Sequence, residues 1–146
     1  MLERFDRDVL PFHPHYLLIL GGSNSLRAGV PAEDVIRDLA AIKEKCLSHG
    51  IKPIFLTLPP INPANISRAF DEPTVDDWSQ QFQRVNDYLR TQVYIDTASA
   101  FKVTSRGLSP TKFALDGLQP DANGKRRMAK IVNAAWEKAR LAADNQ

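Results

Sequence analysis

The sequence predicts a three-layer α/β fold built on a parallel sheet, and three observations support this. Two apolar runs without polar alternation, Tyr16–Leu20 and Ile51–Leu58, are typical of strands buried on both faces. Segments with apolar residues at helical spacing lie between and after these runs. The resulting order, α-β-α-β-α-β-α, predicts right-handed crossovers between parallel strands, with helices on both faces of the sheet.

The first half of the chain supplies one strand–helix–strand unit. Leu2–Leu10 carries a short helical apolar face and is ended by the prolines that follow it. A longer helix is predicted between Pro31, in its first turn, and Gly50, which stops it. Its apolar face consists of Val35, Ile36, Leu39, Ile42, Cys46 and Leu47. The polar, proline-bearing segment Asn62–Pro73 is predicted to be a loop.

The second half adds two helices and a short strand. Thr74 and Asp77 resemble a capping box, which predicts the start of an amphipathic helix there. Val93–Asp96 is predicted to be a third strand and Ala98–Leu115 an irregular loop over the sheet edge. The last helix is expected from about Ala122 to Leu141. Its inner face would consist of Met128, Ile131, Val132, Ala135 and Trp136.

Composition indicates an ordinary globular domain. The 146 residues suffice for a single α/β domain over 1–146, and the net charge of +2 makes no case for nucleic acid. The basic run Lys125–Arg127 is expected to be a solvated helix face. The single cysteine, Cys46, and the lack of metal-ligand spacing or a nucleotide-binding loop predict no disulfide, metal or cofactor. No apolar run is long enough to span a membrane, and no signal-peptide pattern is seen, so the cytoplasm is the default expectation.

The strongest candidate site follows the first apolar run. Gly21 and Gly22 allow a tight turn at the carboxyl end of this strand, the edge where open α/β sheets bind ligands. Asn24 would then present a hydrogen-bond donor to a crevice. The alternative is a β-turn in which Gly and Asn only relieve backbone strain.

A second block, Asp116-Gly117-Leu118-Gln119-Pro120, stands directly before the last helix. Together with Gly22-Ser23-Asn24-Ser25, it resembles the SGNH (GDSL-type) ester hydrolases, whose blocks Gly-x-Asn-Asp and Asp-x-x-His occupy these positions. The run Phe55–Pro60 is also similar to the family. The resemblance implies a flavodoxin-like sheet of five parallel strands, and the two N-terminal strands are expected to be missing from this sequence.

The resemblance also implies a serine acyl-enzyme mechanism acting on carboxylic esters, as in lipases and esterases. By position, Asn24 would be the oxyanion-hole amide and Asp116 the carboxylate that orients the base. Gln119 takes the position of the family His. The neighbouring Gly22, Ser23 and Ser25 would contact a small-molecule ester substrate.

Three departures from the family pattern predict that this chain is inactive by itself. The family's second block, with its oxyanion glycine, should lie before the central strand, where only fifteen residues precede Tyr16. No Gly-Asp-Ser nucleophile block occurs anywhere, and Gln119 cannot accept a proton from serine near neutral pH. His13 and His15 lie at the wrong end of the first strand, and His49 closes a helix, so none is expected to replace the base. The alternative function is a non-catalytic module on the same fold that binds an acylated or glycan ligand.

The strand Tyr16–Leu20 carries a prediction about assembly. If the N-terminal strands are missing, this strand becomes an apolar edge with unpaired backbone groups, which invites another chain. A homo-oligomer, or pairing with a missing N-terminal segment, is therefore expected. In the alternative, the Leu2–Leu10 helix folds back over the edge.

Overall fold

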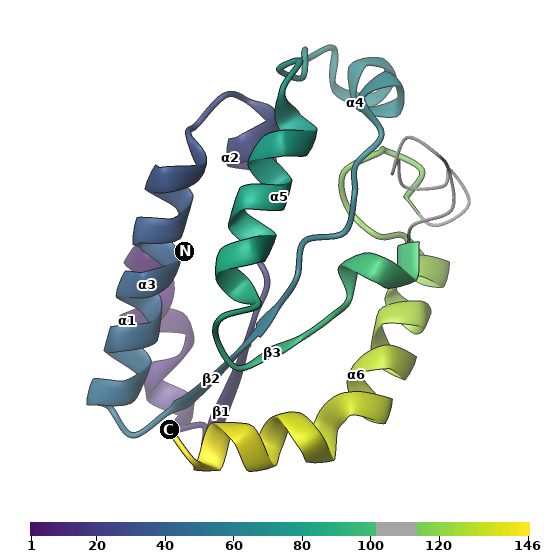
Figure 1. Cartoon of the computed structure of the whole chain (residues 1–146). Helices are drawn as coiled ribbons and strands as arrows, with labels where there is room; N and C mark the ends of the chain where they lie inside the picture. The colour runs from purple at the N-terminus through teal and green to yellow at the C-terminus, as the bar shows by residue number, and fades with distance from the viewer. Residues whose placement is uncertain (102–113) are drawn as a thin grey trace.

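The structure, a computed structural model, describes residues 1–101 and 114–146. Its sheet has three parallel strands in the order β1-β2-β3: β1 (Tyr16–Ile19), β2 (Lys52–Leu56) and β3 (Tyr94–Ile95). Leu18 is in register with Ile54, and Leu56 with Ile95. Helices cover both faces, which confirms the predicted three-layer α/β fold (Figure 1).

The helical elements follow the predicted order, with short turns added. They are η1 (Leu2–Arg4), α1 (Phe5–Asp8), η2 (Leu10–Phe12), α2 (Ser23–Arg27), α3 (Ala32–Ser48), α4 (Pro63–Phe70), α5 (Trp78–Leu89), η3 (Ala98–Phe101) and α6 (Ala122–Asp144). The α3 helix begins one residue after Pro31, and Gly50 follows its end at φ +72°. No helix in the described part of the chain is both long and apolar enough to cross a bilayer.

The central strand β2 is buried on both faces, as its unbroken apolar run predicts. Phe55 points into a cluster with the inner faces of α3 and α5, among them Leu39, Val85 and Leu89. Its neighbours Ile54 and Leu56 point the other way, against α6. Side chains of a strand alternate between the faces, so a strand covered on both sides must be apolar at every position. The five inner-face residues predicted for α6 all pack against this second cluster.

The prediction that Tyr16–Leu20 is buried on both faces is wrong, because one face of this segment is exposed. Leu18 is 41% exposed and Leu20 is 38% exposed, whereas Ile19 is 4% exposed. β1 lies at the edge of the sheet, and α6 reaches it only at Tyr16, whose ring meets Trp136 edge-on at 5.3 Å. Leu18 shares the α6 face with Ile54, but no described element covers it there.

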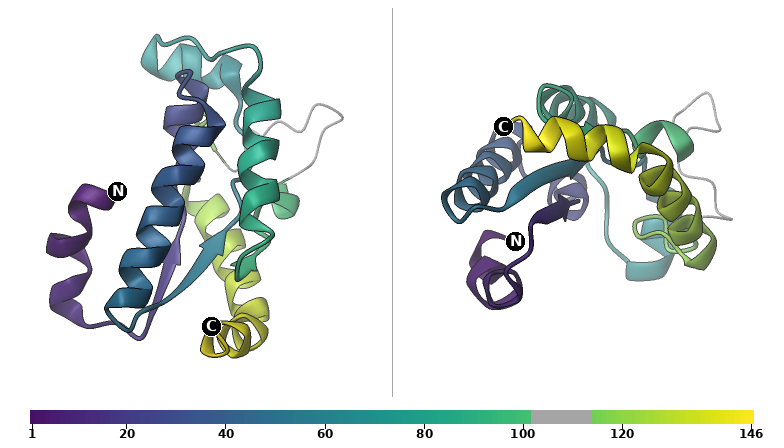
Figure 2. Two further views of the ribbon diagram at one scale, coloured as in Figure 1. Left: turned by 60° about the vertical axis from the view of Figure 1, so that its left-hand side comes forward. Right: turned by 90° about the horizontal axis from the view of Figure 1, so that it is seen from below.

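The N-terminal helix lies beside β1 without closing its edge (Figure 2). Phe5 of α1 is buried in the α3 cluster, against which Leu17 also packs. Between α1 and β1 the structure leaves a groove of about 210 Å³, lined by both elements and by Ile42 of α3. The helix therefore covers part of one face of β1, while Leu18 and Leu20 stay exposed.

The loop predicted for Asn62–Pro73 is wrong, because most of it forms α4. The side chain of Asn62 accepts a hydrogen bond from the Asn65 amide at 3.3 Å, and Pro63 occupies the first turn, where its missing N–H costs nothing. Ile66 is fully buried and anchors the helix. One apolar anchor in a short segment is too little periodicity to detect in the sequence.

The capping box predicted from Thr74 and Asp77 is also wrong. Asp77 itself is the N-cap of α5, and its Oδ2 accepts from Gln81 Nε2 at 3.0 Å instead of capping a backbone amide. Thr74 Oγ1 is buried without a hydrogen-bond partner among the described residues. The predicted loop Ala98–Leu115 begins with η3, and its central part, 102–113, lies outside the described residues.

Candidate active-site crevice

The turn after β1 is held in shape by Gly22. This residue has φ +111°, and a Cβ on it would lie 2.7 Å from Val35 Cγ1 of α3, so both the backbone conformation and the space require glycine. The carbonyl of Gly22 accepts from the amide of Leu26 at 2.9 Å, which starts α2. The segment is thus a strand-to-helix turn, and the simple β-turn considered as an alternative is not what forms.

The block before α6 is fixed just as tightly. Asp116 Oδ1 accepts from the amides of Leu118 and Gln119, both at 2.8 Å. Gly117 has φ +81°, and a Cβ there would lie 2.4 Å from the carbonyl oxygen of Asn62. The Gly117 carbonyl accepts from the Asn62 amide at 2.8 Å. These contacts lock the block against the start of α4, which the sequence did not predict.

The two blocks meet at one small crevice at the carboxyl ends of β1 and β2. Its volume is about 40 Å³, far below the roughly 300–1,000 Å³ of typical ligand pockets. Its lining comes from both blocks and from the segments between them: Leu20, Ser23, Pro59, Pro60, Phe101, Ala114, Leu118 and Pro120. The described residues therefore bring the two blocks together, as an α/β sheet edge allows, around a space that is smaller than a typical ligand pocket.

Of the predicted site residues, only Ser23 lines this crevice. Asn24, Ser25 and Gln119 are exposed nearby, while Gly22 and Asp116 are half-buried in their turns. Asp116 contacts Gln119 through the Gln119 backbone amide. The predicted pairing of a carboxylate with a side chain at the base position is therefore not formed here.

Arg27 is a residue of this region that the sequence did not single out. It is only 6% exposed, and its Nε donates to Asn24 Oδ1 at 2.8 Å. Its other nitrogens donate to the Pro73 carbonyl at 3.0 Å and to the Glu72 carboxylate. With the Asn24 oxygen occupied, the Asn24 amide nitrogen remains as the free donor of that side chain. One arginine three residues after the asparagine gives no sequence signal for this contact.

Asp96 directly follows β3, at the same edge of the sheet as the crevice. It accepts from Thr57 Oγ1 at 2.8 Å and from Ser99 Oγ at 2.7 Å, so it caps the turn into η3. Partial burial acts to raise the pKa of Asp96, but the hydrogen bonds from Ser99 and Thr57 and the charge of Arg90 outweigh it and lower this pKa.

The three histidines of the chain lie away from the crevice. His13, His15 and His49 line a hollow of about 320 Å³ at the amino end of β1, opposite the crevice. His49 Nδ1 lies 2.8 Å from the Lys45 carbonyl. No group of three metal-ligating side chains suited to an ion occurs among the described residues. The crevice therefore has no histidine base in this structure.

The sequence matches no protein-family model, and no curated protein aligns with it. Its structure is similar to that of a GDSL-like lipase from Bacteroides thetaiotaomicron, with a TM-score of 0.80, 20% identity, and coverage of 94% of this chain and 69% of the lipase. A variant of an acetyl-xylooligosaccharide esterase from Geobacillus aligns with a TM-score of 0.60 at 19% identity, over 88% of this chain and 62% of the esterase.

The OSK domain of Drosophila Oskar also aligns, with a TM-score of 0.66 at 16% identity, over 92% of this chain and 67% of that domain. At such identities the likeness concerns the fold. The chain therefore has the fold of GDSL-like lipases and acylhydrolases, and it corresponds to about two thirds of their length.

Proposed function

We propose that this chain, which has the fold of the SGNH (GDSL-type) ester hydrolases, is the C-terminal part of such a domain and acts on carboxylic esters once completed. The main support is the meeting of the Gly22–Ser25 turn and the Asp116–Gln119 block on one crevice at the carboxyl edge of the sheet. In this proposal Asn24 donates to the oxyanion and Asp116 orients the base. Both roles are carried over from the family by position.

Arg27 would prepare Asn24 for that role. A carboxamide can turn either its oxygen or its nitrogen toward a ligand, and only the nitrogen can donate to an oxyanion. The hydrogen bond from Arg27 Nε at 2.8 Å occupies the oxygen. Because the donor is charged, this bond is stronger than one between neutral groups.

The chain by itself should show no ester hydrolysis above background. Gln119 stands where a base is needed, and the three histidines lie elsewhere. Purified chain assayed on p-nitrophenyl acetate tests this. Turnover that survives purification and disappears in Asp116→Ala would contradict it.

Completion of the site would use the open edge of β1. We propose that a Gly-Asp-Ser strand, supplied by an N-terminal segment, pairs there beside α1 and brings its serine to the crevice. The exposed Leu18 and Leu20 and the adjoining groove of about 210 Å³ support this placement. A second copy of this chain could pair through the same edge, which would give a homo-oligomer.

A chimera tests the whole proposal. A strand–turn–helix segment that carries Gly-Asp-Ser is fused before Met1, and Gln119→His is introduced. We expect p-nitrophenyl acetate hydrolysis from this chimera but not from the same chimera with Gln119. A folded chimera, verified by circular dichroism, that remains inactive with His at position 119 would contradict the proposal.

The competing function is a non-catalytic module that binds an acylated or glycan ligand. It is favoured by Gln119, because an amide at the base position is compatible with binding but not with general-base catalysis. The two functions differ in the chimera experiment, since a binding module would give no turnover there.

A further inference from the structure

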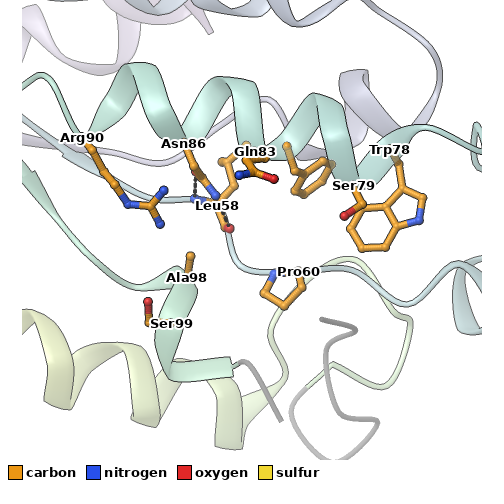
Figure 3. A pocket seen from close by; sticks show the side chains of 10 residues that line it. Leu58, Pro60, Trp78, Ser79, Gln83, Asn86, Arg90, Ala98 and Ser99 are labelled. Atoms are coloured by element: carbon orange, nitrogen blue, oxygen red, sulfur yellow. Dashed lines mark hydrogen bonds between the residues drawn. The ribbon is translucent and has the colours of Figure 1, made fainter. Parts of the chain in front are cut away.

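A second, larger hollow lies on the other side of Pro60 from the crevice. Its volume is about 300 Å³, and Pro60 lines both spaces. We call it the α5–η3 groove, because α5 forms one wall and η3 the opposite one (Figure 3). Its lining residues from α5 are Trp78, Ser79, Phe82, Gln83 and Asn86. The others are Arg90, which caps the C-terminal end of α5, and Leu58, Pro60, Ala98 and Ser99.

We propose that the α5–η3 groove binds a neutral saccharide. Its walls combine polar and apolar groups in the way such a ligand requires. Ser79 and Gln83 make no side-chain hydrogen bond to another described residue, so their hydroxyl and carboxamide groups are available to sugar hydroxyls. Trp78 and Pro60 supply apolar surface for the C–H faces of sugar rings (Figure 3).

The groove runs along one side of α5. The lining residues Ser79, Gln83, Asn86 and Arg90 are separated by four, three and four positions, the spacing of one helix face. Ser79 and Arg90 are eleven positions apart, which corresponds to about 16 Å at roughly 1.5 Å of helical rise per residue. This length is suited to a short oligosaccharide, longer than a single sugar.

Charge in the groove favours a neutral ligand over an anion. Arg90 is the cation of the lining, but its guanidinium lies 3.6 Å from Asp87 and 3.9 Å from Asp96. These two carboxylates offset the positive charge, so a phosphate or carboxylate ligand would meet repulsion as well as attraction. The separations exceed hydrogen-bond length, which leaves guanidinium N–H groups able to donate to hydroxyl oxygens.

The backbone in the groove disfavours an added peptide strand. Leu58 follows the end of β2, and its amide and carbonyl are both occupied by the side chain of Asn86, at 2.7 and 3.1 Å. Strand addition needs unpaired backbone groups, and those of Leu58 are not available. Recognition must then come from the side chains that line the groove.

The test is an NMR titration of the ¹⁵N-labelled chain with xylotetraose, cellotetraose and chitotetraose, each added separately. We expect at least one of them to bind saturably, with a Kd on the order of 1 mM, because few hydrogen bonds form at an exposed site. The side-chain amide of Gln83 and the indole N–H of Trp78 should shift. Inorganic phosphate should leave both signals in place.

Two glutamines of α5 provide a matched pair. Gln83→Ala should weaken binding by about tenfold, since two hydrogen bonds are lost. Gln80→Ala, an exposed position outside the groove, should leave it unchanged. Three results would overturn the proposal: no shift with any saccharide, shifts of the same signals with phosphate, or equal effects of the two substitutions. The titration needs no turnover, so its outcome is independent of the proposed ester hydrolysis.

Discussion

The turn after β1 and the turn before α6 use glycine in the same way but use their polar side chains differently. Gly22 and Gly117 both have positive φ, and both are packed too tightly for a Cβ. The Asn24 side chain is held by another side chain, Arg27, and stays exposed. The Asp116 carboxylate is instead bound to the backbone of its own turn. Residues that match a catalytic motif can therefore already have a structural role.

The largest effect is expected at the first turn. In the active chimera, Asn24→Ala should lower kcat by about 10²–10³, the usual loss for one oxyanion-hole donor. Steady-state kinetics on p-nitrophenyl acetate measure it. Gln80→Ala, an exposed position on α5 outside the crevice lining, is the control. An unchanged kcat in Asn24→Ala would show that Asn24 is only a turn residue.

At the second turn the largest effect is on stability. Gly117→Ala should lower the free energy of unfolding by about 3 kcal/mol, because left-handed strain adds to a clash with the Asn62 carbonyl. Gly50→Ala is the matched control, since φ is +72° there but no atom lies within 4 Å of the added Cβ. It should cost about 1 kcal/mol. Urea unfolding measures both, and equal losses would show that the contact with α4 contributes nothing.

Two substitutions of Asp116 distinguish the loss of a hydrogen-bond acceptor from the loss of a negative charge. Asp116→Ala removes the acceptor of two backbone amides and should cost about 1–2 kcal/mol of unfolding free energy. Asp116→Asn keeps an acceptor oxygen and should stay within about 0.5 kcal/mol of the original chain. If Asn is as harmful as Ala in urea unfolding, the negative charge itself stabilises the turn.

The smallest expected effect concerns pH and a second carboxylate at this edge of the sheet, Asp96. Its pKa is lowered in the folded chain, so its contribution to stability is present above the unfolded-state pKa of about 4 and is lost as pH falls below it. Between about pH 5 and pH 3, the original chain should lose more stability than Asp96→Asn. The difference should be small because Asp96 is partly exposed. Parallel pH dependences would show that the contacts of Asp96 do not favour its ionised form.

The sequence predicted best the strands and helices that pack in the core. Unbroken apolar runs predicted β1 and β2, and helical spacing predicted α3, α5 and α6. Burial demands apolar side chains at the period of each element, so these elements carry their own signal. The helix α4 was not predicted, because it depends on the Asn62 cap and on a contact with Gly117. Gly117 lies 55 positions after Asn62 in the chain.

Sequence alone also determined the residues of both turns, because only glycine tolerates positive φ together with such close contacts. Tertiary structure decided which side chains these turns meet. Arg27 lies three positions after Asn24 in α2, so the helix brings the two side chains together. The contacts of Arg27 with Glu72 and Pro73, which lie more than forty positions away, follow from the tertiary arrangement. The exposure of Leu18 and Leu20 was decided in the same way. An apolar strand has the same sequence pattern at the centre and at the edge of a sheet. Only the arrangement of the neighbouring elements decides whether one of its faces is exposed to solvent.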